Sequence, residues 1–116
     1  MSCLFVFRSV KLNFIFGVAM TPEGRFKRNL KKELHERFPG CIVTQLDPNE
    51  IQGIPDLLIL YKDRWAALEC KKAQDASRRP NQEYYVDLMN QMSYSSFIFP
   101  ENKEAVLDEL QQALRA

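Results

Sequence analysis

Two acidic residues and a lysine lie at the ends of two apolar stretches, where they could carry metal-dependent chemistry. Asp56 follows Pro55, and Glu69 and Lys71 come after twelve and fourteen intervening residues. Carboxylates, water and phosphate oxygens are the ligands that magnesium prefers in proteins. A lysine beside such ligands can place a positive charge on a phosphate group or help to deprotonate a metal-bound water. These residue types therefore indicate a candidate metal site that acts on phosphate groups.

The two acids flank a predicted β-hairpin. Residues 57–61 form a strand that is apolar on both faces and therefore central, and residues 65–70 form the return strand. If a two-residue loop at positions 62–63 joins them, opposed residue numbers add to 125 and Asp56 faces Glu69, with Cβ atoms about 5 Å apart. A three-residue loop would instead place Asp56 opposite Cys70. In the first register the two carboxylates repel each other, and a divalent cation between them removes the repulsion.

Glu69 and Lys71 also share one face of the return strand, because strand side chains alternate. Each residue alone has a common structural explanation. Asp56 is compatible with a turn residue after Pro55, and Glu69 with Lys71 is compatible with an exposed pair of charges. Charged residues at the end of a buried hairpin need a further reason, so the combination favours a functional site.

The first predicted helix adds a third acid. Thr21 is a plausible N-cap, Pro22 occupies the first helical position, and the pair at 39–40 (Pro-Gly) ends the helix. Glu23 lies on the same face as the apolar stripe, three residues before its first member. It is therefore either a partner of the helix dipole or a third carboxylate at the site, and both interpretations remain open. The stripe consists of Phe26, Leu30, Leu34 and Phe38.

The remaining predicted elements complete the order α-β-β-β-α-β-α. Strands are predicted at residues 41–46 and 95–99. A polar, basic loop at 72–79 leads to a helix that begins at Pro80, and a final helix begins at about Asn102. The second helix is expected to bury Tyr84, Tyr85, Leu88 and Met92. The final helix is expected to bury Val106, Leu107, Leu110 and Leu114.

Composition limits the classes of protein that fit. The chain has 116 residues, 46% hydrophobic and 27% charged, which suits one globular domain. A net charge of +1 excludes a general positive coat, so any binding of nucleic acid must use local patches, such as the basic segments 21–40 and 61–80. Three cysteines without a C-x-x-C pair argue against a disulfide scaffold or zinc site and indicate a reducing compartment. The presence of a single histidine argues against a Ser-His-Asp catalytic triad.

Residues 1–20 are apolar but are interrupted by Arg8 and Lys11. No uncharged run approaches the roughly 18 residues that a membrane span needs, and the basic residues are misplaced for a secretory signal. We therefore expect no membrane association and a cytoplasmic location. The domain is expected at residues 21–116, with residues 1–20 as an upstream-start extension or an added strand.

The motif Pro55-Asp56, followed after twelve residues by Glu69-Cys70-Lys71, resembles that of the PD-(D/E)xK nucleases. With Gly53 before it and Pro80-Asn81-Gln82 opening a helix, the chain more closely resembles the stand-alone VRR-NUC nucleases. These are small enzymes, often carried by phages, that are related to Holliday-junction resolvases. The resemblance covers about 80 of the 116 residues. It implies an α/β, restriction-endonuclease-like αβββαβ core, a mixed sheet flanked by helices, to which this chain adds a C-terminal helix.

The resemblance also implies a role for individual residues. The metal would be Mg²⁺, with Mn²⁺ expected to substitute, bound by Asp56, Glu69 and the backbone carbonyl of Cys70, with Glu23 as a possible further ligand. Lys71 would be the catalytic lysine. The catalytic set would comprise Asp56, Glu69, Lys71, Glu23 and Gln82, with the glutamine helping to position the site.

The implied function is a metal-dependent DNA endonuclease that hydrolyses phosphodiester bonds. Nothing resembles a base-reading module, which favours structure-selective cutting of branched or junction DNA over sequence-specific cutting. A chain with one active site needs two copies to cut both strands, so a homodimer is expected. The candidate phosphate contacts are Arg25, Lys27, Arg28, Lys31, Lys72, Arg78 and Arg79.

Two alternative functions make different demands on the sequence. A non-catalytic nucleic-acid-binding or assembly protein on the same fold would be favoured by loss of an acid or of the lysine, and all three residues are present. A small RNA-binding protein would expose aromatic residues among basic ones. Tyr84 and Tyr85 are instead expected to pack against the sheet.

Overall fold

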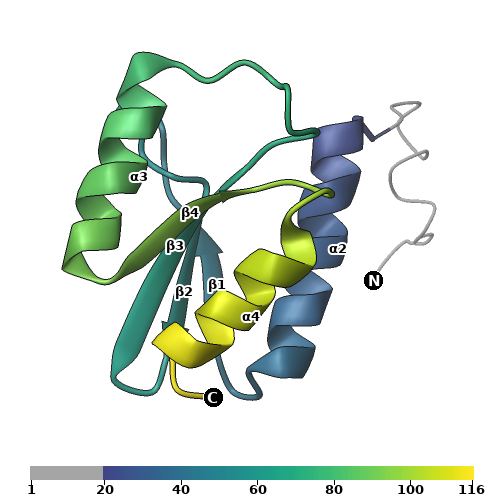
Figure 1. Cartoon of the computed structure of the whole chain (residues 1–116), viewed down its shortest axis with the longest axis vertical. Helices are drawn as coiled ribbons and strands as arrows, with labels where there is room; N and C mark the ends of the chain where they lie inside the picture. Colours follow the sequence, from purple (N-terminus) through teal and green to yellow (C-terminus); the bar gives the residue numbers. More distant parts are fainter. Residues whose placement is uncertain (1–19) are drawn as a thin grey trace, which may run out of the picture.

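The computed structural model describes residues 20–116, and seven helices and strands lie within this range (Figure 1). Their order, α-β-β-β-α-β-α, is the predicted one. The extension expected at residues 1–20 lies outside the described residues apart from Met20, as does Cys3. The helices are α2 (Pro22–Arg37), α3 (Pro80–Met92) and α4 (Lys103–Ala113). The strands are β1 (Ile42–Gln45), β2 (Leu57–Tyr61), β3 (Arg64–Cys70) and β4 (Tyr94–Ile98).

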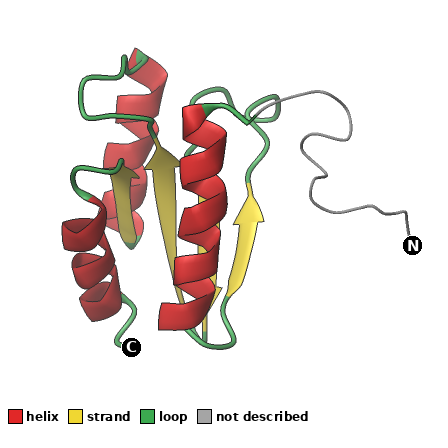
Figure 2. Cartoon of the chain, turned by 90° about the vertical axis from the view of Figure 1, so that its right-hand side faces the viewer, coloured by secondary structure: helices red, strands yellow, loops and turns green. Residues whose placement is uncertain are grey.

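The four strands form one mixed sheet in the order β1-β2-β3-β4. Strand β2 pairs antiparallel with β1 and with β3, whereas β4 runs parallel to β3. A parallel neighbour requires a crossover connection, which α3 provides. Helices α2 and α4 lie on one face of the sheet and α3 lies on the other (Figures 1 and 2). The predicted α/β architecture, a mixed sheet flanked by helices with an additional C-terminal helix, is confirmed.

Helix α2 begins and ends as its sequence predicts. The Thr21 hydroxyl accepts a hydrogen bond from the Gly24 backbone N–H at 3.0 Å, and Pro22 is the first helical residue. Its apolar stripe faces the sheet, where Leu30 and Leu34 are fully buried. Phe38, also fully buried, meets the Tyr61 ring edge-on at a centroid distance of 5.6 Å. This packing fixes the helix on the sheet.

The β2–β3 hairpin has the first of the two registers considered above. Tyr61 pairs with Arg64 and Leu57 pairs with Leu68, so the connecting loop has two residues. One further step along the same register brings Asp56 opposite Glu69. The strand β2 is central, as predicted. Its second face is less covered than its sequence suggests, because α3 lies over β3 and β4, and Leu60 remains 38% exposed.

The predicted buried stripe of α3 is wrong. Tyr84 and Met92 are 61% and 65% exposed, and the helix buries Val86 against Phe97 instead. The expectation that Tyr84 is needed for packing, which counted against an RNA-binding protein, is therefore wrong as well. The other members of the predicted stripe, Tyr85 and Leu88, are half-buried.

The orientation of α3 has a physical reason in two polar residues, Gln82 and Asn90, which lie one helical turn to either side of the buried Val86. Asn90 Oδ1 accepts a hydrogen bond from the Ser95 backbone N–H at 3.0 Å, next to the start of β4. Gln82, two helical turns earlier, bonds to groups at the end of β3, as described below. Because both contacts require the same face as Val86, the larger apolar side chains point elsewhere.

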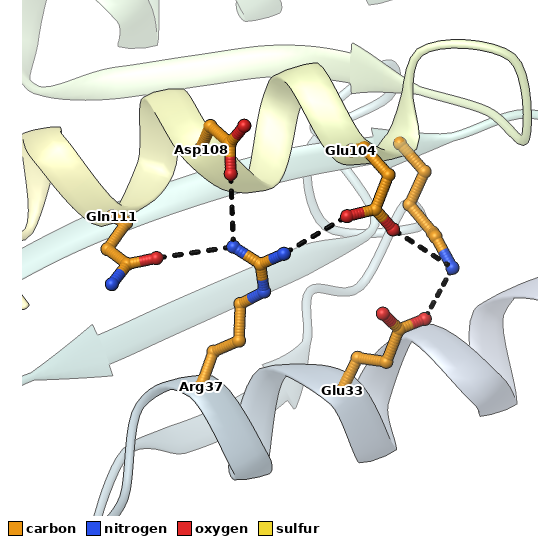
Figure 3. A network of polar contacts seen from close by, with 6 residues as sticks. Glu33, Arg37, Glu104, Asp108 and Gln111 are labelled. Carbon is orange, nitrogen blue, oxygen red and sulfur yellow. Dashed lines mark hydrogen bonds and ion pairs between the residues drawn. The ribbon is translucent and has the colours of Figure 1, made fainter.

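Helix α4 buries three residues of its predicted apolar face, and the fourth, Leu114, is buried at its C-cap. A polar network that sequence analysis missed ties it to α2 (Figure 3). The Arg37 guanidinium donates to Glu104 Oε1 at 3.0 Å, Gln111 Oε1 at 3.2 Å and Asp108 Oδ1 at 3.3 Å. Lys103 pairs with Glu33 of α2 at the other end of the network. The C-terminal helix is therefore an integral part of the sheet-covering layer.

Two further findings concern the described part of the chain. Cys41 and Cys70 are both buried free thiols. None of the helices in residues 20–116 has the length and apolar character needed to cross a membrane.

Candidate active site

Asp56 lies directly before β2 and is held from two sides. Its Oδ2 accepts a hydrogen bond from the Cys70 backbone N–H at 2.9 Å, which joins the two strands of the hairpin at this end. Its Oδ1 lies 3.6 Å from the Lys27 ammonium of α2. Asp56 is therefore a positioned carboxylate that faces the site, as the hairpin register predicted.

Glu69, Lys71 and Gln82 form a connected polar group beside Asp56. Gln82 Nε2 donates to Glu69 Oε2 at 3.1 Å, and Gln82 Oε1 accepts from the Lys71 ammonium at 2.9 Å. The ammonium also lies 3.8 Å from Glu69 Oε2. Gln82 Oε1 further accepts the backbone N–H of Arg79, which fixes the amide in the first turn of α3. The glutamine thus holds the acid and the lysine in a defined arrangement.

The second carboxylate oxygen of Glu69 has no partner. Glu69 is only 3% exposed, and its buried Oε1 makes no hydrogen bond to any described residue. Burial raises the pKa of Glu69 to about 7; the charge of Asp56 adds to the shift, Lys71 opposes it, and Glu23 adds a smaller contribution. Buried polar atoms are normally hydrogen-bonded, so an orphaned carboxylate oxygen beside a second carboxylate needs an explanation. The residues here fit a divalent cation, which takes one or two carboxylates and completes its coordination with water.

Glu23 faces the lysine side of this group. It lies in the first turn of α2 and lines a hollow of about 480 Å³ together with Lys71 and Lys72. Its charge contributes to the raised pKa of Glu69, so it lies within electrostatic reach of the site. Yet no three His, Cys, Asp or Glu side chains in residues 20–116 are close enough together to hold a metal ion. The structure thus gathers two acids, and the role of the third stays a prediction.

A cleft of about 750 Å³ opens beside the two acids, and both line it. Its walls are the loop before β2 and the start of α3. The walls meet at Gly53, where an added Cβ would lie 2.5 Å from Asn81 Cβ and 2.8 Å from its carbonyl carbon. Gly53 also has φ of +94°, a conformation that other residues rarely adopt. Glycine is therefore required at position 53 so that the loop before β2 can touch the start of α3 at Asn81. Sequence reasoning missed this contact.

Two solved structures resemble the chain. One, described as a VRR_NUC domain, is 25% identical with a TM-score of 0.58, over 69% of this chain and 85% of that chain. The other, described as a VRR_NUC domain protein, is 13% identical with a TM-score of 0.59, over 84% of this chain and 92% of that chain, and it shows the fold alone. The chain has a nuclease-type domain that is similar to VRR_NUC domains. No family model and no curated protein matches the sequence. The resemblance inferred from the motif and the restriction-endonuclease-like fold are both confirmed.

The basic residues expected at this VRR-NUC-type site occupy different places. Lys27 pairs with Asp56 as described, Lys72 lines the hollow beside Lys71, and Arg79 lines the cleft. Arg78 stacks over the Phe97 ring at 4.0 Å. The remaining candidates lie on α2, two of them exposed and the third half-buried: Arg25, Arg28 and Lys31. Three of the seven therefore lie at the site, and a direct Lys27–Asp56 contact was not foreseen.

Cys70 contributes to the VRR-NUC-type site through its backbone. Its N–H is bonded to Asp56, while its thiol points into the core on the opposite face of the sheet. Burial raises the pKa of this thiol strongly, so it remains protonated and unreactive. The expected role of the Cys70 carbonyl as a metal ligand stays a prediction.

Proposed function

We propose that this domain hydrolyses phosphodiester bonds in DNA and that Asp56 and Glu69 bind a divalent cation, Mg²⁺ or in its place Mn²⁺. The observation that carries the proposal is the buried Glu69 oxygen without a partner, on a carboxylate that lies beside Asp56 and is fixed by Gln82. When bound, such a cation polarises a phosphate oxygen and lowers the pKa of a bound water. The Cys70 carbonyl is a proposed third oxygen ligand.

Each side chain of the site has a separate task in this proposal. Asp56 is pinned by the Cys70 N–H, and Glu69 by the Gln82 amide, so both carboxylates are oriented before any ligand arrives. The Lys71 ammonium is held by Gln82 Oε1, and Lys71 as a residue is only 9% exposed, so it is largely shielded from bulk water. A positive charge in such a position stabilises the negative charge that develops on a phosphate during attack. Glu23, which lies on the side of Lys71, is proposed as a further ligand of the cation.

The proposed substrate is branched or junction DNA, cut according to its structure. The support is the predicted set of phosphate contacts on α2, in the loop after β3 and at Arg79, which carry no sequence information. A homodimer is proposed for cutting both strands, and the two buried free thiols suit action in the cytoplasm.

The test is a cleavage assay in Mg²⁺ on a panel of branched and linear DNAs, with RNA of the same sequences. Asp56→Asn, Glu69→Gln and Lys71→Ala should abolish cleavage and leave DNA binding nearly intact, and EDTA should do the same. The matched controls lie in the turn of the same hairpin, where both side chains are exposed: Asp63→Asn and Lys62→Ala. Full activity in EDTA, or binding without cleavage by the wild type under all conditions, would reject the enzyme and favour a binding protein.

A further inference from the structure

The cleft beside Asp56 and Glu69 has the size of a ligand pocket. Its volume of about 750 Å³ falls within the roughly 300–1,000 Å³ of pockets that enclose small organic molecules. A nucleoside belongs to this size class, whereas a DNA duplex is far too wide. Because Gly53 holds the loop directly against Asn81, the two walls of the cleft are fixed relative to each other. The cleft is thus a preformed space of nucleoside size next to the acids.

The chemistry of the cleft differs from that of the hollow on the lysine side. The hollow contains Lys71 and Lys72, which suit a phosphate group. In the cleft, the two carboxylates are each paired with a lysine, and in the proposed function they hold the cation and, with it, the phosphate that is cut. Apart from these acids and Arg79, the residues that line the cleft are uncharged, so the rest of the cleft suits an uncharged polar group beside that phosphate.

Amide side chains provide the polar lining of the cleft. Gln82 is engaged with Glu69 and Lys71, whereas Asn49, Gln52 and Asn81 are exposed on its walls. Each amide offers both hydrogen-bond donors and an acceptor. The edges of nucleobases present the same mixture of donors and acceptors, and side-chain amides are their common partners.

We propose that this cleft binds the base of one unpaired nucleotide next to the phosphodiester bond that is cut. The inference rests on the proposed function and narrows its substrate to DNA with an unpaired base beside the cut. A paired and stacked base would first have to leave the duplex to enter a pocket. Flaps, overhangs and gapped junctions supply such a base at no unpairing cost, whereas an intact duplex does not. Selectivity for branched DNA then follows from the requirement for a free base beside the acids.

The experiment maps the cut position on a flap substrate and then replaces single nucleotides by an abasic analogue, which leaves every phosphate in place. An abasic residue next to the cut, on the unpaired side, should lower kcat/KM at least tenfold, and one several nucleotides away should not. Binding affinity is measured in parallel in EDTA, so that base recognition is detected even if no cleavage occurs. If no substrate is cleaved but an abasic residue at one position lowers the affinity, the proposed catalytic function is rejected and base binding in the cleft is retained.

Variants of the cleft wall complete the test. Gln52→Ala and Asn49→Ala should slow cleavage of the intact flap severalfold and have little further effect on the abasic flap. Gln91→Ala, an exposed amide on α3 that does not line the cleft, is the matched control. Equal slowing of intact and abasic substrates by Gln52→Ala, or abasic substrates cleaved and bound within twofold of the intact one, would overturn the proposal.

Discussion

Neutralising Glu69 should stabilise the metal-free protein at alkaline pH, although Glu69 belongs to the candidate active site. Its pKa is raised from 4.5 to about 7, chiefly by burial and then by the charge of Asp56. An acid with a raised pKa in the folded state binds its proton more tightly there than in the unfolded chain. The contribution of Glu69 to the free energy of unfolding is therefore fully present below about pH 4.5 and is lost as the pH rises from there to about 7.

The size of this effect follows from the shift. The interval from 4.5 to about 7 corresponds to a cost of about 3 kcal/mol for ionised Glu69 above pH 7. Glu69→Gln cannot ionise and so avoids this cost, and its amide oxygen can still accept the Gln82 hydrogen bond. The variant loses the ion pair with Lys71 at 3.8 Å, which reduces the gain. We expect metal-free Glu69→Gln to melt about 5–10 °C above the wild type at pH 8.5 and close to it at pH 5.

The assay is thermal unfolding followed by circular dichroism at pH 5, 7 and 8.5 in EDTA. Glu83→Gln, the same change at an exposed position of α3, is the matched control and should show no pH-dependent difference. Adding Mg²⁺ should raise the melting temperature of the wild type and leave Glu69→Gln nearly unchanged, because a ligand stabilises only the folded state that binds it. A Glu69→Gln protein that melts below the wild type at pH 8.5, or by the same margin at every pH, would refute the reasoning.

Three further predictions concern residues around the site and the fold. Glu23→Gln should lower cleavage at least tenfold at limiting Mg²⁺ while changing the metal-free stability by less than about 1 kcal/mol; a lowered melting temperature with normal cleavage would assign Glu23 to the helix dipole. Lys31→Ala should make the salt dependence of DNA binding shallower by about one unit of slope, and an unchanged slope with altered preference among DNA shapes would contradict a phosphate contact. Arg37→Ala should lower the melting temperature by a few degrees, corresponding to about 1 kcal/mol from its partly exposed ion pairs with α4, and the difference should shrink in high salt.

The hairpin shows how far local sequence carries the prediction of a site. Apolar runs and strand alternation were enough to place Glu69 and Lys71 on one face and to bring Asp56 near them. They left two registers open, because a single added loop residue moves every pairing by one position. The observed two-residue loop resolves this choice, and it is the detail on which the facing carboxylates depend.

Helix α3 shows where the same reasoning fails. Apolar spacing selected Tyr84 and Met92 for the core, since large apolar side chains are usually buried. The helix instead turns Gln82 toward Glu69, and this contact overrides the apolar pattern. The Lys27–Asp56 pair was not predictable for a different reason: no local pattern links residues on separate elements. Departures from local rules are expected where a functional site imposes its own geometry.

The electrostatics of the site explain why such departures persist in a small domain. Each acid has a lysine within 4 Å, Lys27 for Asp56 and Lys71 for Glu69, yet burial still leaves Glu69 with a raised pKa and an unpartnered oxygen. An amide at position 69 would satisfy the same neighbours at lower electrostatic cost, so the carboxylate destabilises the metal-free fold. The core beneath β2 and β3 and the α2–α4 network offset that cost from elsewhere in the molecule. A buried acid that destabilises the metal-free protein and is stabilised by a bound cation couples cation binding to the stability of the fold. Stability measurements therefore test this site independently of cleavage assays.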